Sequence, residues 1–281
     1  MSQSSIANET VDHAKERGQF TIIKLLTNTW FLYCVSLIAF FSLWHWTAVE
    51  KIFRDSLATP AQVFNQMVTL TTVKFAGTDL WGHIWASFER VITGFAIASV
   101  VAIPLGLFMA LNKTVNAIVK PLFDLFKPMP PIAWVSIAIL WFGIGETSKV
   151  FIIIIVTFVP CLLNAYNGVR LVDPELYDVI RVLGGTRRDE IFHVCFPASF
   201  PAVFAGLQIS LSAAWTCVLA AELMNSRDGL GFLIKRGMDI HNPALVLAGM
   251  LLIAAAAWIS SLIVSLLERK LCPWKRSIDN V

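Results

Sequence analysis

Residues 172–197 read VDPELYDVIRVLGGTRRDEIFHVCFP, a short polar stretch between two long apolar segments of the chain. Asp173 is placed to cap a helix that begins at Pro174, because proline lacks the N–H group that the first helical turn leaves unpaired. Four apolar residues then recur at helical spacing and form one face of this helix, with Arg181 on the other face. These four are Leu176, Val179, Ile180 and Leu183.

A glycine pair divides the stretch into two parts. Gly184 and Gly185 predict the end of the first helix, since glycine accepts the left-handed backbone found there. Thr186 begins a second short helix, with Asp189 three residues later as its capping-box partner. The second helix carries an apolar face formed by Ile191, Val194 and Phe196. The pattern predicts a bent pair of helices that suits docking in a partner's groove, with an ordinary solvated loop as the alternative.

The rest of the chain has the composition of a membrane protein. Of its 281 residues 57% are hydrophobic and only 15% are charged, and its mean hydropathy is +0.69. Six strongly apolar runs of 18 residues or more lack Asp, Glu, Lys and Arg, and each is long enough for a helix to cross a hydrocarbon core of about 30 Å. These runs are 25–49, 91–112, 128–145, 150–169, 194–221 and 242–267. A buried helix of a soluble protein does not account for six such runs in so short a chain.

We therefore predict an all-α membrane protein with six transmembrane helices. The transmembrane domain is expected over 25–267, with the fifth helix over 197–221 after the polar stretch, and polar tails over 1–24 and 268–281. Fourteen of the 22 Lys and Arg residues lie on the side that holds both tails and the polar stretch. The positive-inside rule places that side in the cytoplasm. Clustered prolines are expected to prevent a regular helix over 121–131 and to leave this segment buried or lining a pathway.

The sequence lacks the patterns of several other classes. No GxxxxGK[ST] segment is present to hold nucleotide phosphates, and no Ser-His-Asp or paired-carboxylate arrangement has a recognisable spacing. The five histidines are not spaced as in HExxH, and the five cysteines form no CxxC pair, so neither a metal site nor a disulfide is expected. We expect no enzymatic activity, no cofactor bound by this chain and no nucleic-acid partner.

The polar stretch is similar to a loop of ABC importer permeases. That family has Glu-Ala-Ala, three residues, Gly, nine residues and then Ile-x-Leu-Pro; here Asp178-Val179-Ile180, Gly184 and Val194-Cys195-Phe196-Pro197 stand at the same spacing. Glycine and proline match outright, and the other positions match in kind. In the family this loop is a coupling helix that sits in a cleft of the ATPase subunit.

The resemblance extends over residues 57–267 and is to the nitrate/sulfonate/taurine/bicarbonate branch of these permeases, with the type I fold. Its most specific stretches are SFERVITGFAIASVVAIPLGL from Ser87, PPIAWVSIAILWFGIGETSK from Pro130 and AAELMNSRDGLGFLI from Ala220. It implies import of a small anion by alternating access in a bacterial inner membrane. It also implies a second permease copy, two ATPase subunits that bind ATP and magnesium, and a periplasmic or lipid-anchored solute-binding protein.

Two sets of residues are predicted to carry this function. The ATPase-coupling set is Asp178, Val179, Ile180, Gly184, Gly185, Arg187, Arg188 and Pro197. The translocation path is expected between two copies of the chain, along the third and fifth spans, with Trp134, Ser136, Trp215, Thr216 and Glu222 as candidates. Glu222 is either a gate or a structural partner of Arg90 or Arg227.

An ion-coupled secondary carrier, or a membrane scaffold or enzyme without an ATPase, is the alternative. Such a carrier should place ionisable residues within its spans and often shows two repeated halves. The six runs hold no ionisable side chain of this kind other than His45, and no internal repeat is visible. The sequence therefore favours an external energy source, with weak polar contacts to the cargo and selection of the anion by the binding protein.

Overall fold

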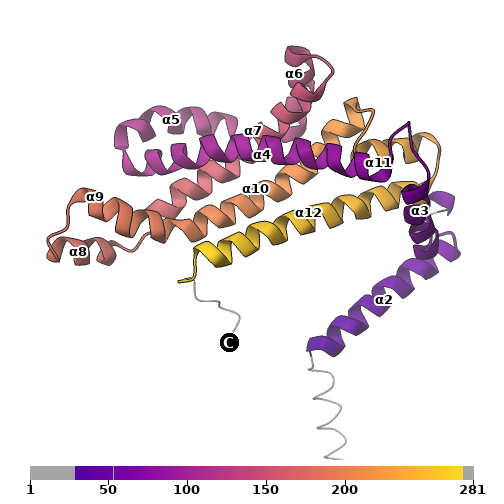
Figure 1. The fold of residues 1–281 in the computed structure, drawn as a ribbon, viewed down its shortest axis with the longest axis horizontal. Helices are drawn as coiled ribbons and strands as arrows, with labels where there is room; N and C mark the ends of the chain where they lie inside the picture. The colour runs from indigo at the N-terminus through magenta and orange to yellow at the C-terminus, as the bar shows by residue number, and fades with distance from the viewer. Residues whose placement is uncertain (1–28, 53, 275–281) are drawn as a thin grey trace, which may run out of the picture. The chain divides into compact units, whose positions relative to one another are not determined.

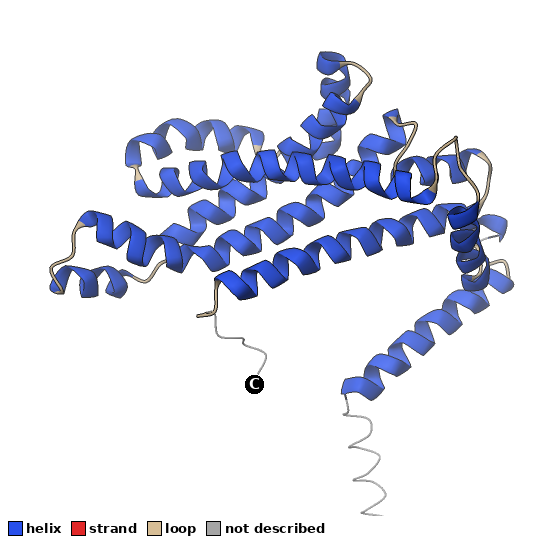
Figure 2. Cartoon of the chain, in the orientation of Figure 1, coloured by secondary structure: helices blue, strands red, loops and turns tan. Residues whose placement is uncertain are grey.

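The computed structural model describes residues 29–52 and 54–274, and these residues form helices and loops without a β-strand (Figure 2). The tail predicted over 1–24 lies outside the described residues, as do residues 275–281 of the second tail. In chain order the helices are α2 (Thr29–Val49), η1 (Arg54–Ser56), α3 (Pro60–Thr72), α4 (Leu80–Leu111), α5 (Lys113–Phe126), α6 (Pro131–Phe142), α7 (Glu146–Arg170), α8 (Pro174–Val182), α9 (Arg187–Asp189), η2 (Glu190–Cys195), α10 (Phe196–Asn225), α11 (Leu230–Asp239) and α12 (Pro243–Leu271).

The lengths and apolar composition of these helices confirm the predicted all-α membrane class. Five of them are long and apolar enough to span a membrane: α2, α4, α7, the run from α9 through α10, and α12. The pair α5 and α6 counts as a sixth span when its two helices, bent by 97° at a short break, are taken together.

The chain divides into two compact units at residues 64 and 65, inside α3. In the first unit, α2 exposes nearly all of its apolar side chains, as expected of a helix whose surroundings are lipid. The indole Nε1 of Trp44 donates a hydrogen bond to the carbonyl of Ala58 (3.0 Å) and ties α2 to the turn before α3.

In the second unit, α7 packs between α4 and α10 through small residues (Figure 1). A Cβ at Gly106 of α4 would lie 2.5 Å from the carbonyl oxygen of Leu162, and one at Gly206 of α10 would lie 2.6 Å from Cβ of Asn164. Close backbone approach of this kind is how helices associate in lipid, where no hydrophobic force drives them together. These contacts position the ends of α4, α7 and α10, where the polar residues gather.

The prolines of 121–131 behave differently from the sequence prediction. Helix α5 continues through Pro121 to Phe126, because a single proline removes only one hydrogen bond from a helix. The break comes at Pro128, Pro130 and Pro131, which follow one another too closely for helix to continue. The third span, expected over 128–145, is thus preceded by a helix of 14 residues that also carries charge.

Candidate functional site

The polar stretch forms two short helical arms joined at the glycine pair, as the sequence predicted. Asp173 Oδ1 accepts a hydrogen bond from the backbone N–H of Glu175 (3.0 Å), and Pro174 is the first residue of α8. We call the segment from Leu171 to Cys195 the hairpin. Both of its arms lie at the end of the bundle where α7 ends and α10 begins (Figure 1).

The two glycines end α8 for different reasons. Gly184 has φ of +78°, the left-handed backbone that side chains with a Cβ adopt at a cost. The N–H of Gly185 donates to the carbonyl of Ile180 (2.9 Å) and that of Gly184 to the carbonyl of Arg181 (3.0 Å), which together form a Schellman ending. A Cβ at Gly185 would lie 2.5 Å from Cγ2 of Ile180, so this position requires glycine for space.

Polar contacts across the turn fix the angle between the arms. The backbone N–H of Thr186 donates to Asp189 Oδ2 (2.7 Å), the contact expected of a capping box. Arg181 Nε donates to Glu190 Oε1 (2.7 Å), so Arg181 bridges the two arms. Burial, above all, and a hydrogen bond with Cys195 raise the pKa of Tyr177 to about 12. The hairpin is therefore held in one shape before any partner binds.

One face of the hairpin is apolar and uncovered. The docking face consists of Leu176, Val179, Val182 and Leu183, exposed by 47%, 56%, 87% and 79%. Ile180, which the sequence placed on this face, is half-buried against Gly185 inside the hairpin. Val182 was not predicted, because it lies between two positions of the helical repeat and becomes exposed only where α8 ends. A contiguous exposed apolar surface on a rigid element is typical of a protein-binding site.

The other residues of the predicted coupling set lie around this face. Asp178, Arg187 and Arg188 are exposed, and Asp178 Oδ1 accepts a hydrogen bond from Arg181 (3.3 Å). Pro197 is half-buried in the first turn of α10. Their contact with an ATPase stays a prediction.

Replacing Gly184 with valine is expected to stop transport without preventing membrane insertion. A β-branched residue at φ of +78° is strained by about 1–2 kcal/mol, which the hairpin relieves by changing the angle between its arms. Uptake by the assembled importer should fall at least tenfold while the amount of chain in the membrane stays unchanged. Gly145→Val is the control, since Gly145 has an extended backbone and open space around it. Uptake at the wild-type level in Gly184→Val would contradict this account.

A buried cluster of charges occupies the opposite end of the second unit. The guanidinium of Arg90, only 4% exposed, donates to Glu222 Oε1 (2.8 Å), to both oxygens of Glu146 (2.6 and 2.8 Å) and to Asp228 Oδ1. Lys149, also 4% exposed, pairs with Glu146 (2.8 Å). The cluster joins α4, α7, α10 and the turn before α11. In this structure Glu222 pairs with Arg90, whereas Arg227 is exposed, and a role of Glu222 as a gate stays a prediction.

The same cluster caps the N-terminus of α11. Glu222, which is fully buried, accepts hydrogen bonds from the backbone N–H of Gly231 (2.8 Å) and from the hydroxyl of Ser87 (2.8 Å). The Ser87 oxygen in turn accepts from the N–H of Leu230 (2.8 Å). A carboxylate is favourable at a helix N-terminus because unpaired N–H groups and the helix dipole converge there.

The predicted path residues fall into three groups. Ser136 and Thr216 are exposed polar side chains on otherwise apolar helices, with the Thr216 hydroxyl bonded to the carbonyl of Ser212 (3.1 Å). Trp215 and Glu222 are enclosed within the chain, at 2% and 0% exposure, and offer no surface to a cargo in this conformation.

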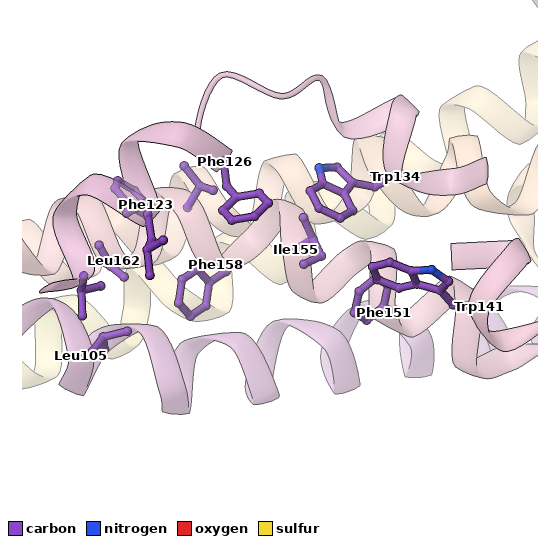
Figure 3. Close-up of a pocket in the computed structure, with 12 residues that line it drawn as sticks. Leu105, Phe123, Phe126, Trp134, Trp141, Phe151, Ile155, Phe158 and Leu162 are labelled. Carbon is purple, nitrogen blue, oxygen red and sulfur yellow. The ribbon is translucent and has the colours of Figure 1, made fainter. Parts of the chain in front are cut away.

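Trp134 faces an apolar cavity. It lines a cavity of about 440 Å³ between α4, α5, α6 and α7 together with Phe126 and Trp141. In Figure 3 the ring of Phe126 lies beside Trp134, and that of Trp141 lies beside Phe151. All the residues that line this cavity are aliphatic or aromatic, so it offers an anion neither charge nor a cluster of hydrogen-bond donors.

Comparisons with known proteins agree on one family. Residues 102–277 match the family model of the binding-protein-dependent transport system inner membrane component. The taurine transport system permease protein TauC of Escherichia coli is 32% identical over 84% of this chain and 86% of its own length. The putative aliphatic sulfonates transport permease protein SsuC of Bacillus subtilis is 31% identical over 79% of each chain. The nitrate import permease protein NrtB of a Synechocystis species is 32% identical over 75% of this chain and 81% of its own.

A solved structure shows the same fold at low sequence identity. A chain of the MetNI methionine ABC transporter, in an inward-facing conformation, superposes with a TM-score of 0.59 at 14% identity. The match covers 68% of this chain and 97% of that one.

Proposed function

The chain belongs to the binding-protein-dependent inner membrane components, in the nitrate/sulfonate/taurine/bicarbonate branch of ABC importer permeases, and from this we propose that it imports a small anion by ATP-driven alternating access. In this proposal two copies of the chain form the pathway. Two ATPase subunits bind ATP and magnesium in the cytoplasm, and a solute-binding protein delivers the anion on the other side.

The exposed docking face of the hairpin carries this proposal. Val182 and Leu183 are among the most exposed large apolar side chains of the chain, yet they sit on an element that is capped and cross-braced. An apolar helical face of this kind binds in a hydrophobic groove of a partner. The ATPase cleft that the family resemblance implies is such a groove. The rigid hairpin then transmits movements of the ATPase to α7 and α10.

The distribution of basic residues supports a cytoplasmic position for the hairpin. Six spans would put both tails and the hairpin on the same side of the membrane, and these segments carry 11 of the 22 Lys and Arg residues, against eight in the segments of the other side. With the positive-inside rule this gives cytoplasmic termini in the bacterial inner membrane. The Arg90 cluster then lies at the outer end of the bundle, where its role is to hold α11 in place.

The names of the relatives support the cargo class. Taurine, aliphatic sulfonates and nitrate name the three relatives above, and another relative is a bicarbonate transport permease, CmpB, of Synechococcus elongatus. These substrates share a small anionic group. A permease that has to release its cargo needs weak contacts, so the choice among anions belongs to the binding protein. Ser136 and Thr216, which are polar and exposed, are proposed as contacts of this weak kind.

Exchanging the binding protein tests this assignment. The importer is reconstituted with its own binding protein and with a relative of different specificity that still stimulates ATP hydrolysis. Uptake of labelled taurine, nitrate and bicarbonate is then compared. We expect the preference among these anions to change with the binding protein by at least tenfold. An unchanged preference would place a selective site in the permease and contradict the proposal.

A further inference from the structure

Helix α5 carries a charged face that the bent third span brings into the membrane region. Lys113, Lys120 and Lys127 recur every seven residues, which places them on one side of the helix at steps of about 10 Å. Asn116 and Asp124 share this side. We call these five residues the α5 polar face. Lys120 and Asp124, paired at 2.6 Å, are each 49% exposed, and Lys113 and Lys127 are exposed as well.

The packing of α5 against α4 and α7 fixes its depth in the membrane. The neighbouring side of the helix packs Val119 and Phe123 against a buried cluster that includes Ala102 and Met109 of α4 and Leu162 of α7. Residues 102–109 lie inside the uncharged run 91–112, which is the part of α4 suited to hydrocarbon. Helix α5 therefore runs beside the membrane-embedded part of α4.

Lipid does not suit the α5 polar face. Long lysine side chains reach toward an interface, but the short side chain of Asp124 cannot. Charged residues within membrane spans almost always face the bundle interior or a water-filled cavity. Asn116 is half-buried at the edge of the face, but the rest of the described chain does not cover its charged residues, because Lys120 and Asp124 remain half exposed.

A dry contact with a second copy does not suit it either. Three lysines and one aspartate give the face a net charge of +2. Among the described residues, no ion pair involves Lys113 or Lys127. Two such faces pressed together would repel, whereas water and anions would stabilise each of them.

We propose that the α5 polar face lines a water-filled path through the assembled importer and that Lys113, Lys120 and Lys127 are successive weak contacts for the transported anion. The proposal rests on the proposed function. It replaces the sequence-based expectation that the spans offer no basic residue to the cargo. Contacts at three separated positions allow an anion to enter and leave, because no single site binds it tightly.

Thiol labelling tests the proposal without requiring knowledge of the cargo. In a Cys34→Ser background, Ala117→Cys places a thiol beside the α5 polar face, and Ile118→Cys places one on the exposed apolar side of the same helix. The permease with its ATPase subunits, in lipid vesicles, is treated with two methanethiosulfonates of opposite charge, sulfonatoethyl and trimethylammonioethyl. Each rate is divided by the rate of the same reagent with a free thiol in solution.

We expect Ala117→Cys to react with both reagents and to favour the anionic one about tenfold, as charged water-filled clefts do. The triple change K113Q/K120Q/K127Q should reduce this ratio to one or less, and Lys270→Gln should leave it unchanged. Ile118→Cys should not react. The proposal is overturned if Ala117→Cys is unreactive in the vesicles but reacts after denaturation, if both cysteines react alike, or if the ratio is insensitive to the lysines. Because labelling needs no transport, a complex that imports none of the tested anions still decides this proposal separately.

Discussion

Replacing Val182 with aspartate should abolish anion uptake while the chain remains folded and inserted. Val182 is 87% exposed in the isolated chain, and substitutions at such positions change the free energy of unfolding by about 0.5 kcal/mol or less. In the ATPase groove the same change removes apolar burial of about 1.5 kcal/mol or more and adds the desolvation of a carboxylate. A total above about 3 kcal/mol weakens the complex more than a hundredfold.

The measurement is co-purification of the ATPase with the permease, followed by uptake in reconstituted vesicles. Val73→Asp is the matched control, because Val73 is an exposed valine in the loop between α3 and α4. That variant should retain the ATPase and transport normally. If Val182→Asp binds the ATPase as wild type does, the docking face is not where the two subunits meet.

Arg90→Gln should have the largest effect on the stability of the chain itself. It leaves Glu222, fully buried, without its cationic partner and removes the link to Glu146 and Asp228. Breaking a buried ion pair on one side costs about 3–5 kcal/mol, because the remaining charge has no compensation. We expect a lower unfolding temperature in detergent and a smaller amount of folded chain in the membrane.

Two further variants separate this explanation from a general effect of losing an arginine. Arg227→Gln changes an exposed arginine in the same turn and should have little effect. The double variant Arg90→Gln with Glu222→Gln removes both buried charges and should be more stable than Arg90→Gln alone. If the double variant loses as much stability as Arg90→Gln and Glu222→Gln lose in sum when each is made alone, the two charges are not coupled.

Local signals in the sequence were sufficient for the hairpin. Capping at Asp173 and Thr186 and the left-handed position at Gly184 depend on neighbouring residues only, and each is found as predicted. The membrane class followed from the lengths of the uncharged runs. These features need no knowledge of tertiary contacts.

Tertiary contacts account for what the sequence did not reveal. Arg90 and Glu222 are 132 positions apart, so no local pattern could join them. Ile180, predicted on the apolar face, is half-buried because it packs against Gly185 in the turn, and Val182, for which the sequence predicted no role, is exposed instead. Lys113, Lys120 and Lys127 were among the fourteen basic residues assigned to the cytoplasmic side, but they lie on or at the end of α5, which packs against α4.

This chain should transport only when an ATPase drives it, and uptake by matched vesicles tests that dependence. Purified chain alone, given an ion gradient, is compared with the chain assembled with its ATPase subunits, binding protein, ATP and magnesium. The account predicts uptake of at least one of taurine, nitrate and bicarbonate only in the assembled vesicles. Net uptake by the chain alone, driven by the gradient, would contradict it and identify a secondary carrier.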